Sequence, residues 1–132
     1  MNKINFNNFN LSKDILKALE QLGYKNPSEV QEKVIPFILG NKDVIVKSQT
    51  GSGKTAAFAI PICENIQLEE RKPQVLVLTP TRELAIQIKQ DFSSIGLFKR
   101  INCIAVFGKE PSSIQKDRLN QRVHVIVGTP CR

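Results

Sequence analysis

The sequence is poor in cysteine, and its three cysteines, Cys63, Cys103 and Cys131, lie far apart. Their number is odd and no two of them form a Cys-x-x-Cys pair, which argues against a disulfide framework and against a zinc site. The sequence also lacks any uncharged apolar run of about 18 residues, and its first residues lack the apolar stretch of a signal peptide. We therefore expect a soluble protein of the reducing cytoplasm with no membrane contact.

Runs of like charge are also absent, although the chain is strongly basic. Its formal net charge is +7 and its pI is about 9.5, with lysines and arginines spread along the sequence rather than gathered in a tail. With 132 residues, of which 41% are hydrophobic, the chain is long enough for one domain with a real core. The charge favours a polyanionic partner such as nucleic acid, or else reflects general solubility.

Hydrophobic periodicity divides the chain into two parts. Up to residue 40 the spacing is helical, which predicts helices from about Leu11 to Leu22 and from about Pro27 to Leu39, the second with Pro36 as a possible kink. From residue 41 onward, short apolar runs alternate with helical stretches, which favours parallel strands buried on both faces. The predicted strands are Val44–Val46, Val75–Leu78, Ile101–Phe107 and Val123–Val127. The expected fold class is α/β, with an open parallel sheet flanked by helices.

The first predicted strand runs directly into a glycine-rich turn and a helix start, and this junction predicts a loop that binds a nucleoside triphosphate. Its residues are Ser48, Gln49, Thr50, Gly51, Ser52, Gly53, Lys54 and Thr55. Backbone N–H groups and the helix N-terminus make such a loop attractive to anions, and glycines let phosphates approach closely. Lys54 is expected to contact the β- and γ-phosphates and Thr55 to hold Mg²⁺. The alternative is a plain turn with a solvated lysine.

Three further loops leave the carboxyl ends of the predicted strands, where ligands bind in open α/β sheets. They cover Thr79–Arg82, Gly108–Glu110 and Gly128–Arg132. Their threonines, glycines and single basic side chains are residue types that contact phosphate oxygens without reading bases. Each loop alone fits an ordinary turn or helix cap. Their shared edge predicts a surface for a phosphodiester backbone.

Together these motifs resemble the first RecA-like domain of the DEAD-box RNA helicases. Gly23–Gln31 is similar to the Q motif of that family, with Phe6 at the place of its upstream aromatic residue. Residues 48–55 resemble motif I, Pro80–Ala85 matches motif Ia, and Thr129–Arg132 resembles motif Ib. The resemblance nearly covers the chain. It implies a helical segment with the Q motif over residues 1–40 and an incomplete RecA-like P-loop sheet over residues 41–132.

The resemblance implies an ATP site that includes the N-terminal segment. Phe6 would stack on the adenine, Tyr24 would belong to the same site, and Gln31 would hydrogen-bond the adenine edge. An amide pairs with N6 and N7 of adenine but not with O6 and N7 of guanine, so Gln31 would select ATP over GTP. The residues themselves also allow another interpretation. Ser28 and Gln31 fit a capping box, in which the Gln31 side chain reaches back to the start of its own helix.

For RNA, the resemblance implies contacts to the sugar-phosphate backbone from the loops that follow the strands. The implied residues are Pro80, Thr81, Arg82, Gly108, Thr129 and Arg132. The chain departs from the family in two of these loops, where Lys109 and Cys131 stand in place of glycines. Lys109 could compensate by its charge, whereas Cys131 adds bulk without charge.

The Asp-Glu-Ala-Asp sequence of the family, its Ser-Ala-Thr segment and its second RecA-like domain are not in this sequence. Phosphoryl transfer depends on positioning and charge neutralisation, and an arginine finger alone is worth about 10³–10⁵ in rate. We therefore expect a truncated piece of an ATP-dependent RNA helicase, with little or no ATPase activity and no unwinding. The parent, with its second domain, would unwind short RNA duplexes. The alternatives are a catalytically silent interaction module and another P-loop ATPase.

Overall fold

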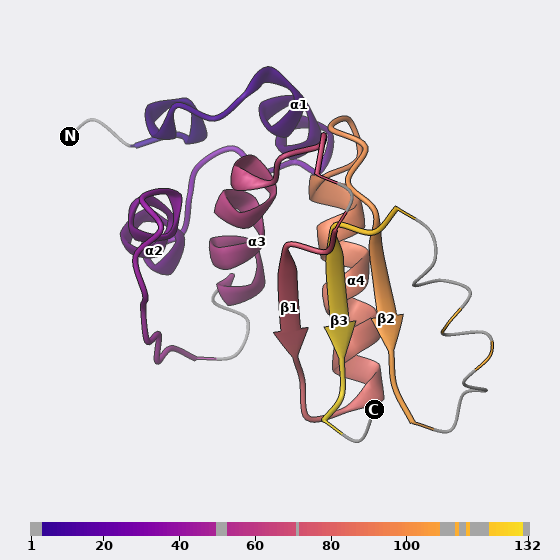
Figure 1. Ribbon diagram of the computed structural model, residues 1–132. Helices are drawn as coiled ribbons and strands as arrows, with labels where there is room; N and C mark the ends of the chain where they lie inside the picture. Colours follow the sequence, from indigo (N-terminus) through magenta and orange to yellow (C-terminus); the bar gives the residue numbers. More distant parts are fainter. Residues whose placement is uncertain are drawn as a thin grey trace.

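The computed structural model describes residues 4–49, 53–70, 72–108, 113, 116 and 122–130. A short 3₁₀ helix and three α-helices come first: η1 (Phe6–Phe9), α1 (Lys13–Gln21), α2 (Glu29–Leu39) and α3 (Lys54–Asn65). They are followed by β1 (Val75–Leu78), α4 (Arg82–Ile95), β2 (Cys103–Val106) and β3 (Val125–Gly128) (Figure 1). The expected α/β class is confirmed. None of the helices within these ranges has the length and apolar character needed to cross a bilayer.

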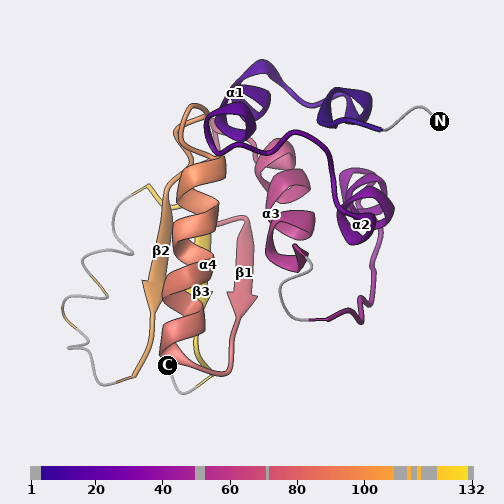
Figure 2. The same cartoon turned by 180° about the vertical axis from the view of Figure 1, so that it is seen from behind.

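The three strands form one parallel sheet in the order β1-β3-β2. Val75 of β1 and Cys103 of β2 both stand opposite Val125 of β3, so the carboxyl ends of the strands lie along one edge. Helix α4 covers one face of the sheet, as Figures 1 and 2 show from opposite sides. Phe92 of α4 is fully buried in the same core as Val125 and Val127. Burial of each such side chain stabilises the fold by about 1.5–3 kcal/mol.

Strand β1 lies at one edge of the sheet. Its side chains alternate, since Val75 and Val77 are half-buried whereas Leu76 and Leu78 are 65% and 62% exposed. Successive side chains of a strand point to opposite faces, and α4 covers only one of them. The predicted burial on both faces is therefore wrong for β1. It is confirmed for β2, where Cys103, Ile104 and Ala105 are all buried.

The two predicted N-terminal helices are confirmed as α1 and α2. Ile15, Ala18 and Leu19 form the buried side of α1, at the spacing that the periodicity indicates. Pro36 lies inside α2, and α2 packs along α3. The expected domain boundary near residue 40 stays a prediction.

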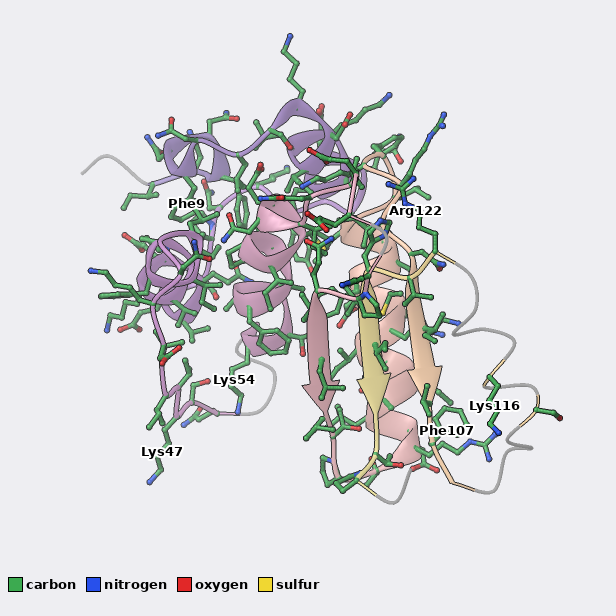
Figure 3. The ribbon with its side chains drawn as sticks, in the orientation of Figure 1. Phe9, Lys47, Lys54, Phe107, Lys116 and Arg122 are labelled. Atoms are coloured by element: carbon green, nitrogen blue, oxygen red, sulfur yellow. The ribbon has the colours of Figure 1, made fainter. Side chains whose placement is uncertain are left out.

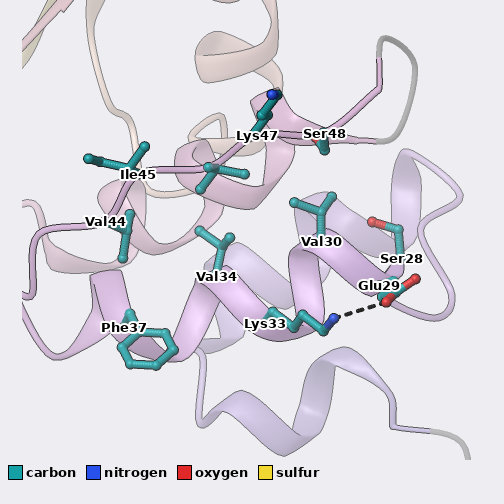
Figure 4. Close-up of a pocket in the computed structure, with 11 residues that line it drawn as sticks. Ser28, Glu29, Val30, Lys33, Val34, Phe37, Val44, Ile45, Lys47 and Ser48 are labelled. Carbon is teal, nitrogen blue, oxygen red and sulfur yellow. Dashed lines mark hydrogen bonds and ion pairs between the residues drawn. The ribbon is translucent and has the colours of Figure 1, made fainter.

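The predicted strand Val44–Val46 is wrong, because these residues form no strand in the structure. They belong to an extended segment that faces Val30, Val34 and Phe37 of α2 across a groove of about 760 Å³ (Figure 4). Ile45 is fully exposed. A strand needs a neighbouring strand to satisfy its backbone groups, and none of the described strands pairs with this segment. The apolar run indicates a tendency to be buried but does not specify what buries it.

Two of the three cysteines lie within the described residues. Cys63 and Cys103 are buried and free. Burial raises the pKa of each thiol to about 12, so neither is a reactive thiolate at neutral pH. Cys131 lies outside the described residues.

His124 ties the amino ends of the three strands together. Its Nδ1 accepts a hydrogen bond from the Asn102 backbone N–H at 2.9 Å, and its carbonyl accepts one from Gln74 at 2.9 Å. The ring is buried, and its Nε2 has no hydrogen-bond partner among the described atoms. Burial first, and then the positive charges of Arg122 and Lys99, lower the pKa of His124 below its ordinary value.

We expect the free energy of unfolding to fall as the pH drops below about 6.5, the ordinary histidine pKa. Below this pH, His124 binds a proton in the unfolded chain more readily than in the folded chain. The stability that neutral His124 contributes above this pH is therefore lost below it. His124→Gln, which cannot take up a proton, should be less stable at pH 7.5 but show a flatter decline. Urea unfolding midpoints at pH 7.5 and 5.5 check this, and equal declines in both proteins would contradict it.

Candidate functional site

The glycine-rich loop ends in a backbone conformation that only glycine adopts easily. Gly53 has φ of 89° in the left-handed region and immediately precedes the first residue of α3. A Cβ at this position would lie 2.6 Å from Nε2 of Gln31 and 3.2 Å from Oγ of Ser28. The start of α3 is therefore pressed against the start of α2. Thr50, Gly51 and Ser52 of the predicted loop lie outside the described residues.

Lys54 turns back toward the loop that precedes it. Its Nζ donates a hydrogen bond to the Ser48 carbonyl oxygen at 2.8 Å, while the neighbouring Lys47 points away from the protein (Figure 3). Thr55 is half-buried in the first turn of α3, and Gln49 is exposed. An ammonium group and a helix N-terminus both attract anionic groups such as phosphates.

Gln31 makes the capping interaction that the sequence allows. Its side chain is 4% exposed, and its Oε1 accepts from the Ser28 backbone N–H at 2.9 Å. Its Nε2 donates to the Gly53 carbonyl at 3.3 Å. Both ends of the amide are thus engaged, one in the capping box of α2 and the other on the glycine-rich loop. The expected contact with adenine stays a prediction.

Phe6 and Tyr24 lie together, with ring centroids 6.1 Å apart. Phe6 is buried, and its ring also lies 6.2 Å from that of Phe9. Burial, and secondarily the charge of Asp91, raise the pKa of Tyr24, which stays neutral. The two rings line a cavity of about 480 Å³. None of Ser28, Gln31 and Gly53 lines it, so this cavity is distinct from the cluster around Gly53.

The loop after β1 combines a helix cap with an exposed cation. Thr79 is buried, and its Oγ1 donates to the Thr81 carbonyl at 3.0 Å. Oγ1 of Thr81 accepts from the Leu84 N–H at 3.1 Å and so caps α4. Pro80, Thr81 and Arg82 are exposed. Local capping chemistry therefore explains Thr81, whereas the exposed Arg82 remains available to a ligand.

The other two loops lie at the same edge of the sheet. Gly108 follows β2 and is half-buried, and the Thr129 N–H after β3 donates to the Val106 carbonyl at 3.1 Å. Thr129 is 9% exposed, so it presents much less surface than Arg82. The structure therefore brings Arg82, Gly108 and Thr129 to one edge, whereas Lys109, Cys131 and Arg132 lie outside the described residues.

The sequence interpretation missed two supporting residues. Lys99 donates from Nζ to the carbonyls of Cys63 and Glu64 at 2.7 and 2.8 Å, and so holds the last turn of α3. The Phe107 ring lies 4.7 Å from the guanidinium carbon of Arg82. The aromatic residue directly before Gly108 was the available signal for Phe107. Lys99 has no local signal, because its partners lie more than thirty residues away.

Comparison with known proteins gives one consistent family. Residues 28–132 match the sequence model of the DEAD/DEAH box helicases. The chain is 58% identical over 127 residues to the ATP-dependent RNA helicase DbpA of Bacillus subtilis (strain 168), covering 96% of this chain and 26% of that protein. It is 44% identical to the DEAD-box ATP-dependent RNA helicase CshA of Geobacillus kaustophilus (strain HTA426), covering 96% and 27%. The chain thus spans about a quarter of the length of these curated relatives.

A solved structure shows the same arrangement. The crystal structure of a DEAD box protein from the hyperthermophile Methanococcus jannaschii matches with a TM-score of 0.92 and 38% identity. The match covers 97% of this chain and 35% of that one. The backbone of nearly the whole chain therefore follows the same course as part of a much longer protein.

Proposed function

Because the chain belongs to the DEAD/DEAH box helicase family, we propose that it forms the ATP-binding and RNA-backbone-binding part of an ATP-dependent RNA helicase. The observation that carries the proposal is the junction of Gly53 and Lys54, where a left-handed glycine opens α3 and an ammonium group already bonds a loop carbonyl. In a longer protein with a second RecA-like domain, ATP use would be coupled to the separation of short RNA duplexes.

The residues present fit a nucleoside triphosphate and its metal. Gly53 has no side chain, and a Cβ there would collide with Gln31. Only backbone therefore stands at the start of α3, which suits the close approach of a phosphate. Lys54 would exchange the Ser48 carbonyl for phosphate oxygens, and the Thr55 hydroxyl would hold Mg²⁺. Bound Mg²⁺ would supply a divalent charge that offsets the charge of the phosphates.

This chain alone is proposed to bind ATP with little or no hydrolysis. Among the described residues, no three His, Cys, Asp or Glu side chains are grouped so that they could hold a metal ion. A metal at Thr55 would therefore take most of its negatively charged ligands from the phosphates. Binding and turnover are separate measurements, and only binding is expected of these residues.

Gln31 should determine the choice of ATP over GTP. Gln31→Glu keeps a side-chain oxygen that can accept from the Ser28 N–H but loses the N–H donor that adenine recognition requires. We expect this variant to lose about 10-fold in ATP affinity, the order of one hydrogen bond to a buried polar group. It should also melt below the wild-type temperature, because a carboxylate oxygen would face the Gly53 carbonyl that Nε2 bonds in the wild type. Competition of ATP and GTP against a fluorescent ATP analogue measures the preference.

Gln31→Ala serves as the matched control, because it removes both the cap and the donor. It should lose stability as well as ATP preference. If Gln31→Glu binds ATP as tightly as wild type and still ignores GTP, then capping is the whole role of Gln31. If wild type binds neither nucleotide, the chain is a silent interaction module and the proposed function is wrong.

Arg82 should contact the RNA backbone without reading sequence. Arg82→Ala is expected to weaken binding to single-stranded oligonucleotides of different sequence by a similar factor. It should also flatten the dependence of log affinity on log salt by about 0.7, the contribution of one phosphate on a single strand. Lys89→Ala is the charge-matched control, since Lys89 is exposed on α4 two turns beyond the edge. A loss that depends on sequence, or an equal loss for Lys89→Ala, would contradict the proposed contact.

A further inference from the structure

Arg82 and Phe107 lie on two loops that follow β1 and β2, which are not neighbouring strands. The guanidinium carbon of Arg82 lies 4.7 Å from the centroid of the Phe107 ring, within the range of a cation–π contact. Arg82 opens α4 after β1, and Phe107 directly follows β2. Strand β3 lies between β1 and β2, so the contact crosses the carboxyl end of the middle strand.

The fold itself brings the two side chains together. Neighbouring strands are about 4.8 Å apart, so β1 and β2 are separated by roughly twice that distance. Helix α4 packs mainly on β2 and β3, which carries its first residue toward the end of β2. The Phe107 ring is 7% exposed and belongs to the core under α4. It therefore offers a fixed surface, whereas Arg82 is exposed and intrinsically flexible.

A cation–π contact does not use the hydrogen-bond donors of Arg82. A guanidinium group interacts with an aromatic ring through its flat face, while its N–H groups point outward in the plane and can donate to phosphate oxygens. Immobilising a long side chain on binding costs entropy. A ring that holds the guanidinium group beforehand reduces that cost. The Phe107 contact therefore prepares Arg82 for a phosphate without competing for it.

We propose that Phe107 is a positioning residue that holds Arg82 ready for the RNA backbone. This inference rests on the proposed RNA-binding function and adds to it a residue whose effect on RNA affinity passes through Arg82. A purely structural Phe107 would affect the stability of the core and would influence RNA affinity equally whether or not Arg82 is present. The two roles therefore differ in how the effects of Phe107 and Arg82 combine.

The test is a double-mutant cycle in RNA affinity. Fluorescence anisotropy with a single-stranded uridine oligonucleotide at about 0.1 M salt, where electrostatic contacts remain strong, is measured for wild type, Phe107→Leu, Arg82→Ala and the double variant. Phe107→Leu should weaken binding by about two- to five-fold in the presence of Arg82, the size of an exposed cation–π contact. It should have no further effect when Arg82 is alanine. Phe107→Tyr, which keeps the ring, should bind as wild type does.

Each other outcome overturns one claim. Equal weakening by Phe107→Leu with and without Arg82, or none at all, would overturn the positioning role while leaving the proposed function intact. If Arg82→Ala itself leaves RNA affinity unchanged, the proposed backbone contact fails. Circular dichroism of every variant shows that the fold is kept, and Phe107→Met replaces Phe107→Leu if the leucine variant is unfolded.

Discussion

Lys54→Ala should lower the affinity of the chain for ATP with Mg²⁺ by about 10- to 100-fold. The Nζ of Lys54 bonds the Ser48 carbonyl at 2.8 Å in the structure, and it would transfer this bond to phosphate oxygens. A hydrogen bond that involves a charged group contributes about 1.5–3 kcal/mol, and 1.4 kcal/mol is a factor of ten in affinity. Titration calorimetry with ATP measures the loss.

Lys47→Ala is the control for this substitution. It removes the same charge from the same segment, but the Lys47 side chain points away from the protein (Figure 3). It should reduce ATP affinity by less than about two-fold, because a solvated charge at a distance is screened. Equal losses for the two variants would show that general positive charge, rather than a specific contact, attracts the nucleotide.

Gly53→Ala should reduce the free energy of unfolding by about 2–5 kcal/mol. Forcing a non-glycine residue into the left-handed region costs about 1–3 kcal/mol. The new Cβ would also lie 2.6 Å from Nε2 of Gln31, so the amide must give up its bonds to Ser28 and Gly53. A thermal melt should show a drop of roughly 5–20 °C for a chain of this size.

Two further variants separate the causes of that loss. Gly23 has a similar φ of 81°, but a Cβ there would meet nothing within 4 Å. Gly23→Ala should therefore report backbone strain alone and lose less stability. In the Gln31→Ala background only the Ser28 Oγ at 3.2 Å still crowds residue 53, and Gly53→Ala should then cost only slightly more than Gly23→Ala. If Gly53→Ala were as mild as Gly23→Ala in the wild-type background, the contact between the starts of α2 and α3 would not constrain the loop.

Local signals were sufficient for most of the fold. The spacing of Ile15 and Leu19 predicts α1, the Ser28 cap marks the start of α2, and the apolar runs of β1, β2 and β3 are confirmed within two residues of their predicted ends. The Val44–Val46 segment could not be predicted in this way. Whether an apolar run becomes a strand depends on a pairing strand that lies far along the chain. The sequence of the run does not indicate which strand that is.

The candidate site divides along the same line. Glycine at position 53 and lysine at position 54 follow from the chemistry of phosphate binding, and the structure shows the backbone and the hydrogen bond that suit it. The bond from Gln31 to the Gly53 carbonyl joins residues 22 positions apart. The contact of Arg82 with Phe107 depends on the strand order β1-β3-β2. Neither follows from local sequence.

Strand β1 has two features that favour association between copies of the protein. Leu76 and Leu78 give the strand an apolar exposed face, and no described strand pairs with its outer edge. Unpaired strand edges favour association between molecules. The net charge of +7 keeps copies apart, but the range of that repulsion shrinks from about 10 Å at 0.1 M salt to about 3 Å at 1 M. Raising the salt concentration in a titration of RNA binding therefore also weakens the charge repulsion between copies of the protein. Dilute protein samples are needed at the highest salt concentrations.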